Sequence, residues 1–371
     1  MADSPLKIAY LITDSGTGGA QRHLADLYAA LAGRVDATVL AGGEGAMLRE
    51  MEATGARAIP VPLLDNSLSP LRGMRLLGQI VATLRRVRPD LIHAHSAKAG
   101  AIARLAGALL RIPVVYTVHG FAFKPEAPAL QRLVAQLTES MLAPFTTRMI
   151  CVSSAEHAMA RRLPLRTARI ATIPNGIPDT AHRADPTARV ERIVMAARFA
   201  PPKRPDLLID AGRRLQPSQP VEIIIAGDGP QLDIMRAYAS NTPPLVQITL
   251  PGEVEDMPAL LASAQIFVLL SDHEGFPLSV LEAMRAGLPI VASDLPGIRE
   301  QLDNGNCGVL VPPRNPGAVA AALQALAADP ARRAELGNAA RRRYASHYRI
   351  GPMAELTWQV YLDTLQARKR P

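Results

Sequence analysis

With 371 residues, the chain is too long for one ordinary hydrophobic core and too short for three, so two domains of about 180 residues each are expected. A hydrophobic content of 48% with 20% charged residues excludes a disordered chain. No apolar run approaches the roughly 18 residues of a membrane span, and the two cysteines show neither metal spacing nor a disulfide framework, so we expect a cytoplasmic protein.

The net charge of +8 is divided unevenly along the chain. Residues 1–180 hold 20 basic and 13 acidic residues, or +7, whereas residues 181–371 hold 21 and 20, or +1. The excess is concentrated in the region Arg72–Arg111, which contains Arg72, Arg75, Arg85, Arg86, Arg88, Lys98, Arg104 and Arg111. Such a region attracts anionic lipid headgroups or nucleic acid, or it is the solvated face of Arg-rich helices.

Short apolar, β-branched runs recur, each followed by a longer segment of helical periodicity, and this alternation predicts parallel sheets with crossover helices. In the first half the runs are 7–13, 36–42, 56–62, 91–96, 114–120, 148–153 and 169–176. In the second half they are 192–199, 221–229, 246–252, 265–271, 289–294 and 307–313. The predicted fold class is α/β, with two Rossmann-like parallel-sheet domains.

Residues 174–186 carry three prolines and an Asn-Gly pair, which is typical of a linker. We therefore divide the chain into domains at 1–180 and 181–352, followed by a last helix at 353–367. Ligands of open parallel sheets bind outside the carboxyl ends of the strands, so we expect the ligand loops of the two domains to face each other across a cleft.

The first strand is followed by a glycine-bearing loop, SGTGGAQRHLADL, over residues 15–27. Gly16, Gly18 and Gly19 let the backbone approach a bound group closely, and the next helix would direct its amides at that group. The segment lacks both the Gly-Lys-Ser/Thr ending of a Walker loop and the glycine spacing of a dinucleotide fingerprint. By itself it does not define a function.

Histidines end two of the first-half strands. His119 is either a functional group at the edge of the sheet or a satisfied structural residue. His93 and His95 alternate along their strand, and we expect them on opposite faces, where they cannot bind one metal ion from the same side. No acidic residues with suitable spacing accompany them, so we predict no bound metal.

Two cations follow the first strand of the second half, where Arg198 ends the strand and Lys203 comes five positions later. The chain has only five lysines against 36 arginines, so a lysine at this position is less readily explained as an incidental surface residue. Fixed cations at adjacent strand ends would neutralise the charge that develops on a departing diphosphate. The alternative is a pair of solvated basic residues in a proline-rich turn.

The pattern of the segment 271–294 predicts, in order, the end of a strand, a glycine-bearing loop, a helix that ends at a glycine, and a second strand. Glu274 lies at the end of the strand and Glu282 eight residues later in the helix. A helix N-terminus presents unpaired amides and a positive dipole end, so the backbone from Gly275 to Ser279 could hold a diphosphate while the carboxylates bind the flanking sugars. Without this context, a surface glutamate pair would be the simpler interpretation.

Together and in this order, GGAQ, TVHGFAF, R-x4-K and E-x7-E resemble the family 4 glycosyltransferases, which are retaining enzymes of the GT-B fold, over essentially the whole chain. HSAKAGAIARLAG and YTVHGFAF are similar to the branch that builds bacterial capsular, exopolysaccharide and O-antigen repeat units. The resemblance implies an N-terminal acceptor-binding domain, on which the helix at 353–367 packs back, and a C-terminal nucleotide-sugar-binding domain.

The resemblance also implies residue roles. Glu274 would face the donor sugar hydroxyls and Glu282 the ribose, and His119 would lie by the reacting centre. Arg198 and Lys203 would bind the diphosphate. The other implied substrate-binding residues are Gly18, Gly19, Gln21 (near the acceptor), Gly227, Gly229, Val254 (against the base), Gly275, Phe276, Pro277, Leu278 and Ser279.

The implied reaction is a metal-independent transfer, with retention, from a nucleotide-sugar to a glycan or an undecaprenyl-diphosphate-linked sugar. The family tends toward UDP, although GDP-linked donors are well represented, and no cofactor is expected beyond this co-substrate. Because lipid-linked acceptors lie at the inner face of the membrane, we expect peripheral docking through Arg72–Arg111. One departure is that Arg204 and Pro205 follow Lys203, where relatives often have glycine, and Arg204 would add charge near the diphosphate.

Other functions remain open. A nucleotide-sugar epimerase of the same fold would turn over its substrate without an acceptor, and a phosphorylase would need a pyridoxal phosphate lysine, for which the sequence shows no convincing place. A basic nucleic-acid-binding or scaffold protein is disfavoured because aromatic residues are only 4% and no recognition helix or RNA module accompanies the charge. We expect no nucleic acid partner.

Overall fold

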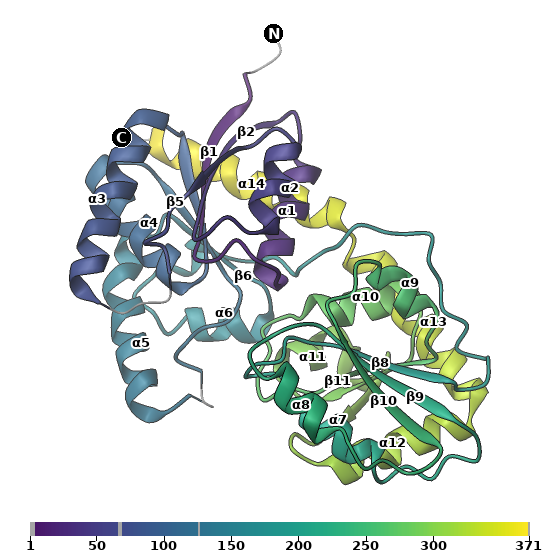
Figure 1. Cartoon of the computed structure of the whole chain (residues 1–371). Coiled ribbons are helices and arrows are strands. Elements are labelled where there is room, and N and C mark those ends of the chain that lie inside the picture. The colour runs from purple at the N-terminus through teal and green to yellow at the C-terminus, as the bar shows by residue number, and fades with distance from the viewer. Residues whose placement is uncertain (1–3, 66–68, 125–126, 370–371) are drawn as a thin grey trace. The chain divides into compact units, whose positions relative to one another are not determined.

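The computed structural model describes residues 4–65, 69–124 and 127–369, which form two compact units (Figure 1). The N-terminal unit joins the chain up to Gly176 to the segment from Ile350 onward, and the C-terminal unit is Ile177–Arg349. The boundaries between the units thus lie at 176/177 and 349/350, where the sequence-based division has 180/181 and 352/353.

The N-terminal unit contains a seven-stranded parallel sheet in the order β3-β2-β1-β4-β5-β6-β7. Its strands are β1 (Leu6–Ile12), β2 (Val35–Ala41), β3 (Arg57–Pro60), β4 (Leu91–His95), β5 (Val114–Val118), β6 (Arg148–Cys151) and β7 (Ile170–Thr172). Its helices are α1 (Gly19–Ala30), α2 (Ala46–Ala53), α3 (Pro70–Val87), α4 (Ala97–Leu110), α5 (Ala129–Leu142), α6 (Ser154–Ala160) and α14 (Ile350–Lys369), with 3-10 turns at Ala143–Phe145 and Thr167–Arg169.

Helices cover both faces of this sheet, which explains why β4 and β5 are buried along their whole length. One core cluster joins residues of α3, α4 and α6 to the sheet, and a second joins α1, α2 and α14 to the other face. Tyr361 of α14 is fully buried in the second cluster, where its hydroxyl lies 2.7 Å from Nδ1 of His93 and 3.4 Å from the hydroxyl of Tyr10. The last helix is therefore part of the N-terminal core.

The C-terminal unit contains a six-stranded parallel sheet in the order β10-β9-β8-β11-β12-β13. Its strands are β8 (Arg192–Ala196), β9 (Val221–Ala226), β10 (Val246–Gly252), β11 (Ile266–Leu269), β12 (Ile290–Ser293) and β13 (Val309–Val311). Its helices are α7 (Pro205–Gly212), α8 (Leu232–Tyr238), α9 (Met257–Ala262), α10 (Leu278–Ala286), α11 (Pro296–Gln301), α12 (Pro316–Ala328) and α13 (Pro330–His347), with a 3-10 turn at Asp303–Gly305.

The segment predicted as a linker is held against the C-terminal unit from Ile177 onward. Tyr344 of α13 donates to the carbonyl of Ile177 at 3.0 Å, and Arg341 pairs with Asp179 at 2.7 Å. Across the described ranges, no helix combines the length and the apolar character needed to cross a bilayer.

Candidate functional site

The segments predicted to bind a nucleotide-sugar follow four neighbouring strands of the C-terminal sheet. The strands β10, β9, β8 and β11 lie side by side and parallel, so their carboxyl ends meet at one edge of the sheet. The loops after them carry, in this order of strands, Val254, Gly227 with Gly229, Arg198 with Lys203, and Glu274. The sheet order thus brings together at one edge residues that are far apart in the sequence.

Lys203 and Glu274 form an ion pair across two of these loops. Nζ of Lys203 lies 2.6 Å from Oε1 of Glu274, and the two side chains are only 17% and 11% exposed. The backbone fixes this arrangement, because Lys203 forms an antiparallel bridge with Ser271 and the amide of Asp272 donates to the carbonyl of Pro202 at 2.9 Å. The cation and the carboxylate are therefore fixed beside each other at the edge of the sheet.

The loop that contains Glu274 leads into α10. Gly275 and Phe276 are buried, and Pro277 occupies the N-cap position, where no side chain caps the helix. The first amides of a helix and its dipole favour an anion at this end. Leu278 and Ser279 lie in the first turn of α10, and the half-buried Glu282 lies in its second turn.

The Arg198 loop and the glycine loop after β9 approach each other so closely that two glycines are required. Arg198 itself is exposed. Gly227 has φ +134°, and a Cβ there would lie 2.2 Å from the carbonyl oxygen of Ala197. Gly229 has φ +152°, and a Cβ there would lie 2.7 Å from the carbonyl oxygen of Phe199. Any side chain at these positions would displace the backbone that presents Arg198.

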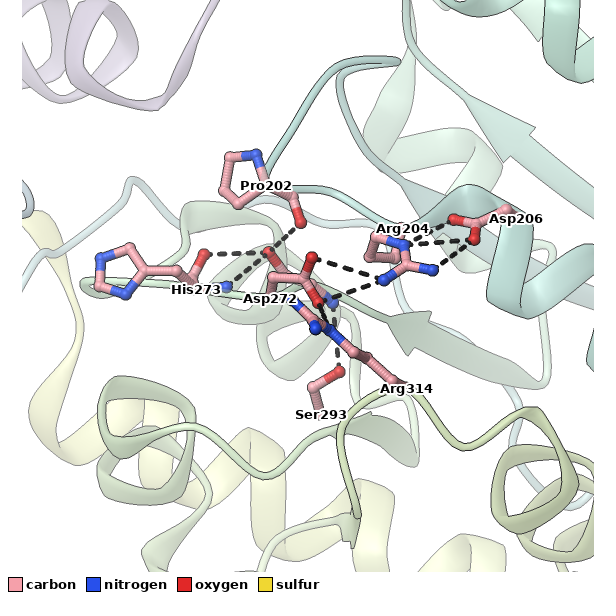
Figure 2. A network of polar contacts seen from close by, with 8 residues as sticks. Pro202, Arg204, Asp206, Asp272, His273, Ser293 and Arg314 are labelled. Carbon is pink, nitrogen blue, oxygen red and sulfur yellow. Dashed lines mark hydrogen bonds and ion pairs between the residues drawn. The ribbon is translucent and has the colours of Figure 1, made fainter. Parts of the chain in front are cut away.

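The loop after β11 also contains Asp272, which the sequence reasoning did not single out (Figure 2). Its carboxylate accepts from Nε of Arg314 at 2.8 Å and lies 3.3 Å from a guanidinium nitrogen of Arg204. Although burial acts to raise it, the pKa of Asp272 is lowered by the hydrogen bond from Arg314 and the charges of both arginines. Arg204 also donates to Asp206 at 2.6 Å. A cavity of about 420 Å³ adjoins Lys203, Arg204 and Asp206.

This network corrects the expectation that Arg204 adds charge near a diphosphate. Its guanidinium is shared by two carboxylates, so its positive charge is largely balanced within the loop. The proline that follows it stands in the first turn of α7, as expected for a residue that lacks an amide hydrogen.

In the N-terminal unit, the glycine loop after β1 leads into α1, with Gly18 at the N-cap position. Gly18 and Gly19 are exposed, and no side chain caps this helix. Gln21 is half-buried in the first turn, and its Nε2 donates to the carbonyl of Asp14 at 3.3 Å. The backbone at the start of α1 is thus accessible to a ligand.

Beside this loop, β1, β4 and β5 adjoin in the sheet, and the histidines His23, His95 and His119 form a cluster there. Nδ1 of His95 lies 3.1 Å from Nε2 of His119, and the ring centres of His23 and His119 are 4.8 Å apart. Burial lowers the pKa of all three, to about 4 for His23, so the rings are neutral at pH 7. The cluster therefore offers uncharged hydrogen-bonding groups.

The expectation that His93 and His95 point to opposite faces of β4 is wrong. Residues two apart on a strand share a face, and the two ring centres are 4.2 Å apart. His95 also lies beside His23 and His119, and each of these three histidines offers a nitrogen within 4.8 Å of the other two, a set of ligands that could hold a transition-metal ion. The bond between His95 and His119 already uses one nitrogen of each ring. That the protein binds no metal stays a prediction.

The region Arg72–Arg111 is only partly an exposed basic surface. Arg104 is fully buried and forms two hydrogen bonds, of 2.7 and 3.1 Å, with the carboxylate of Glu139. Arg72 and Lys98 both pair with the carboxylate of Asp65. The remaining basic residues are exposed: Arg75, Arg85, Arg86, Arg88 and Arg111.

Two parallel-sheet units of this kind are the architecture of the GT-B glycosyltransferases, and solved structures support this class. Anabaena Alr3699/HepE in complex with UDP and glucose matches with a TM-score of 0.81 at 23% identity, over 96% of this chain and 100% of that chain. Sucrose-phosphate synthase from Thermosynechococcus elongatus matches with a TM-score of 0.78 at 21% identity, over 98% and 100%. The fold is GT-B.

Residues 17–181 match the family described as Glycosyltransferase Family 4, and residues 181–343 match Glycosyl transferases group 1. A glycogen synthase of Mycobacterium tuberculosis is 30% identical over 311 residues, covering 81% of this chain and 74% of that protein. The UDP-Gal:alpha-D-GlcNAc-diphosphoundecaprenol alpha-1,3-galactosyltransferase of Escherichia coli is 29% identical over 273 residues, covering 69% and 70%. The chain belongs to the family 4 type of GT-B glycosyltransferase.

Proposed function

We propose that this glycosyltransferase moves a hexose or N-acetylhexosamine-type sugar from a UDP-sugar to a glycan or undecaprenyl-diphosphate-linked acceptor, with retention of configuration, in bacterial surface polysaccharide synthesis. The observation that carries the proposal is the Lys203–Glu274 pair at the edge of the sheet where α10 begins. The E. coli relative, named for a UDP-Gal donor and a diphosphoundecaprenol acceptor, supports the nucleotide and the acceptor class. The HepE complex with UDP and glucose supports the nucleotide.

In this proposal the C-terminal unit holds the donor. Arg198, Lys203 and the backbone from Gly275 to Leu278 bind the diphosphate, whose negative charge grows as the sugar departs. Glu282 binds the ribose hydroxyls, and Glu274 binds the hydroxyls of the sugar. Val254 lies against the base.

The proposed reaction breaks the bond between the anomeric carbon and the diphosphate and forms a bond from that carbon to an acceptor oxygen on the same face. The acceptor proton passes to a phosphate oxygen of the leaving UDP, so the reaction needs no enzymic nucleophile. We propose that no resident metal or cofactor takes part, because fixed cations and amides stabilise the leaving group.

For the N-terminal unit, we propose that the backbone of Gly18 and Gly19 assists at the diphosphate, that Gln21 lies near the acceptor and that His119 contacts the donor sugar. A neutral His119 can donate or accept a hydrogen bond with a sugar hydroxyl. We further propose that the protein acts in the cytoplasm and docks peripherally on the anionic inner membrane through the exposed basic residues of Arg72–Arg111.

The test is a thermal-shift screen of the purified protein against UDP, GDP and ADP, then against their sugars, because a ligand that binds the folded state raises its melting temperature. We expect UDP to give the largest shift, and a chelator to leave both the shift and sugar transfer unchanged. Turnover of the donor without acceptor would indicate an epimerase instead. A shift with GDP or ADP alone would overturn the UDP assignment.

A further inference from the structure

The helix α5 turns its large apolar side chains outward. Helical positions three and four apart share a face. Leu130, Leu133, Val134, Leu137 and Met141 have this spacing, and each is between 55% and 75% exposed. An apolar stripe of this kind normally faces a core, so its exposure requires an explanation.

The opposite face of α5 explains the orientation, because it carries a buried acid. Glu139 makes its bidentate contact with Arg104 of α4, whose guanidinium also stacks over the ring of Tyr116 at 4.6 Å. Turning α5 to bury its leucines would leave Arg104 buried without its partner, which is strongly unfavourable. The fold therefore fixes the apolar stripe on the outside.

The neighbouring helices of the same unit also carry exposed large apolar side chains. Contacts join α3 to α4 and α4 to α5, and Leu71 and Met74 of α3 and Leu109 of α4 are also exposed. Among the described residues, ten of the fourteen exposed large apolar side chains lie on these three helices and on the 3-10 turn that continues α5. We call the outer surface of α3, α4 and α5 the helical face.

The charges on the helical face are of one sign. The sequences of α3 and α4 contain no acidic residue, and the one acid of α5 is the buried Glu139. Arg75, Arg85 and Arg86 of α3 and Arg132 of α5 are exposed. A second copy of the chain on this face would bring like charges together, whereas an anionic bilayer surface complements both the charges and the apolar side chains.

We propose that α5 is the membrane-inserting element of this glycosyltransferase, with Leu130, Leu133, Leu137 and Met141 entering the headgroup and acyl boundary of an anionic bilayer while the arginines of α3 bind the headgroups. This inference rests on the membrane docking of the proposed function and adds the element that inserts. Binding then has an apolar part that persists at high salt and an electrostatic part that salt screens.

The test is flotation of the full chain with vesicles of phosphatidylethanolamine and phosphatidylglycerol, at low and at high salt. We expect Leu133→Gln/Leu137→Gln to bind about tenfold more weakly than the wild type at both salt concentrations. Arg75→Gln/Arg85→Gln/Arg86→Gln should bind more weakly at low salt only. The control Ile234→Gln/Leu245→Gln, which changes exposed apolar residues of the C-terminal unit, should bind as the wild type does.

Melting temperatures near that of the wild type would show that the variants fold, as expected for exposed positions. Unchanged binding of the leucine variant together with weaker binding of the arginine variant would overturn the inference and leave the proposed docking intact. A wild type that does not float with the vesicles would overturn both. A wild-type dimer that the leucine variant dissociates, without vesicle binding, would assign the helical face to a second copy and contradict the inference.

Discussion

The ammonium group of Lys203 lies 2.6 Å from a carboxylate oxygen of Glu274, although the two residues stand on loops after different strands, β8 and β11. The ion pair limits the rotamers of both side chains. It places a cation next to a carboxylate that can accept hydrogen bonds from sugar hydroxyl groups. In the proposed site, the cation binds the diphosphate and the carboxylate binds the sugar attached to it. Substitution of each residue should therefore affect a different step.

Glu274→Gln keeps the size of the side chain and removes its charge. We expect UDP affinity to change by less than about threefold, while kcat falls by about a hundredfold, because the lost contacts are to the sugar and strengthen in the transition state. Calorimetry with UDP and steady-state transfer kinetics measure the two effects. Glu255→Gln, at an exposed position in the loop after β10, is the control. Full kcat in Glu274→Gln would remove Glu274 from the reaction.

Gly227→Ala should lower the free energy of unfolding of the C-terminal unit by about 1–3 kcal/mol, because φ is positive there and the new Cβ would meet the backbone of Ala197. Gly78→Ala is the matched control, since Gly78 lies inside α3 with nothing near its added Cβ. The control should gain about 0.4–1 kcal/mol. Chemical denaturation measures both, and equal effects of the two substitutions would contradict the close approach of the loops.

Arg104→Met leaves the Glu139 carboxylate without its partner in a buried place, and should lower the free energy of unfolding of the N-terminal unit by about 3–5 kcal/mol. The double variant Arg104→Met/Glu139→Leu removes both charges and should recover most of this loss. Urea denaturation of the wild type, the two single variants and the double variant gives the coupling energy. Additive losses would show that the two side chains do not depend on each other.

The buried histidines predict acid sensitivity. Burial holds the pKa of His23 at about 4 in the folded protein, against about 6.5 in an unfolded chain. Between these values the unfolded chain binds a proton that the folded one does not, so stability falls as the pH falls from about 6.5 to about 4, by roughly 1.4 kcal/mol per pH unit for this group. His23→Asn should flatten the slope of unfolding free energy against pH. Equal slopes in wild type and variant would contradict a neutral His23.

Local patterns predicted the fold well, because each of the thirteen strands lies in an apolar run that a helix or turn signal bounds. Each expected strand range overlaps an observed strand, from β1 to β13, and only β1 and β2 begin one residue before the expected range. The donor-site segments were also visible locally, since Glu274 and Lys203 each stand just after a strand, and parallel strand ends share an edge. What local patterns could not give was the order of strands that makes these two loops neighbours.

The features that the sequence did not reveal depend on partners far away in the chain. From the sequence alone, Arg104 was interpreted as part of a basic surface, because its partner Glu139 lies 35 residues later in the chain. Asp272 is paired with Arg314, which lies 42 residues later in the chain, and His23 contacts His119, which follows β5. That His93 and His95 share a face was predictable, because side chains alternate with a two-residue period along a strand. The expectation of opposite faces applied this period wrongly.

The most direct test of the donor site is a calorimetric titration of UDP into the wild type and into Lys203→Ala and Glu282→Ala, with Lys98→Ala as control. Lys98 is a comparable choice, because it is also a partly buried lysine paired with a carboxylate, that of Asp65. We expect the Lys203 and Glu282 variants to bind UDP at least about tenfold more weakly, through lost charge-assisted hydrogen bonds, and the control to bind normally. Wild-type affinity in both site variants would contradict a nucleotide site at this edge of the C-terminal sheet.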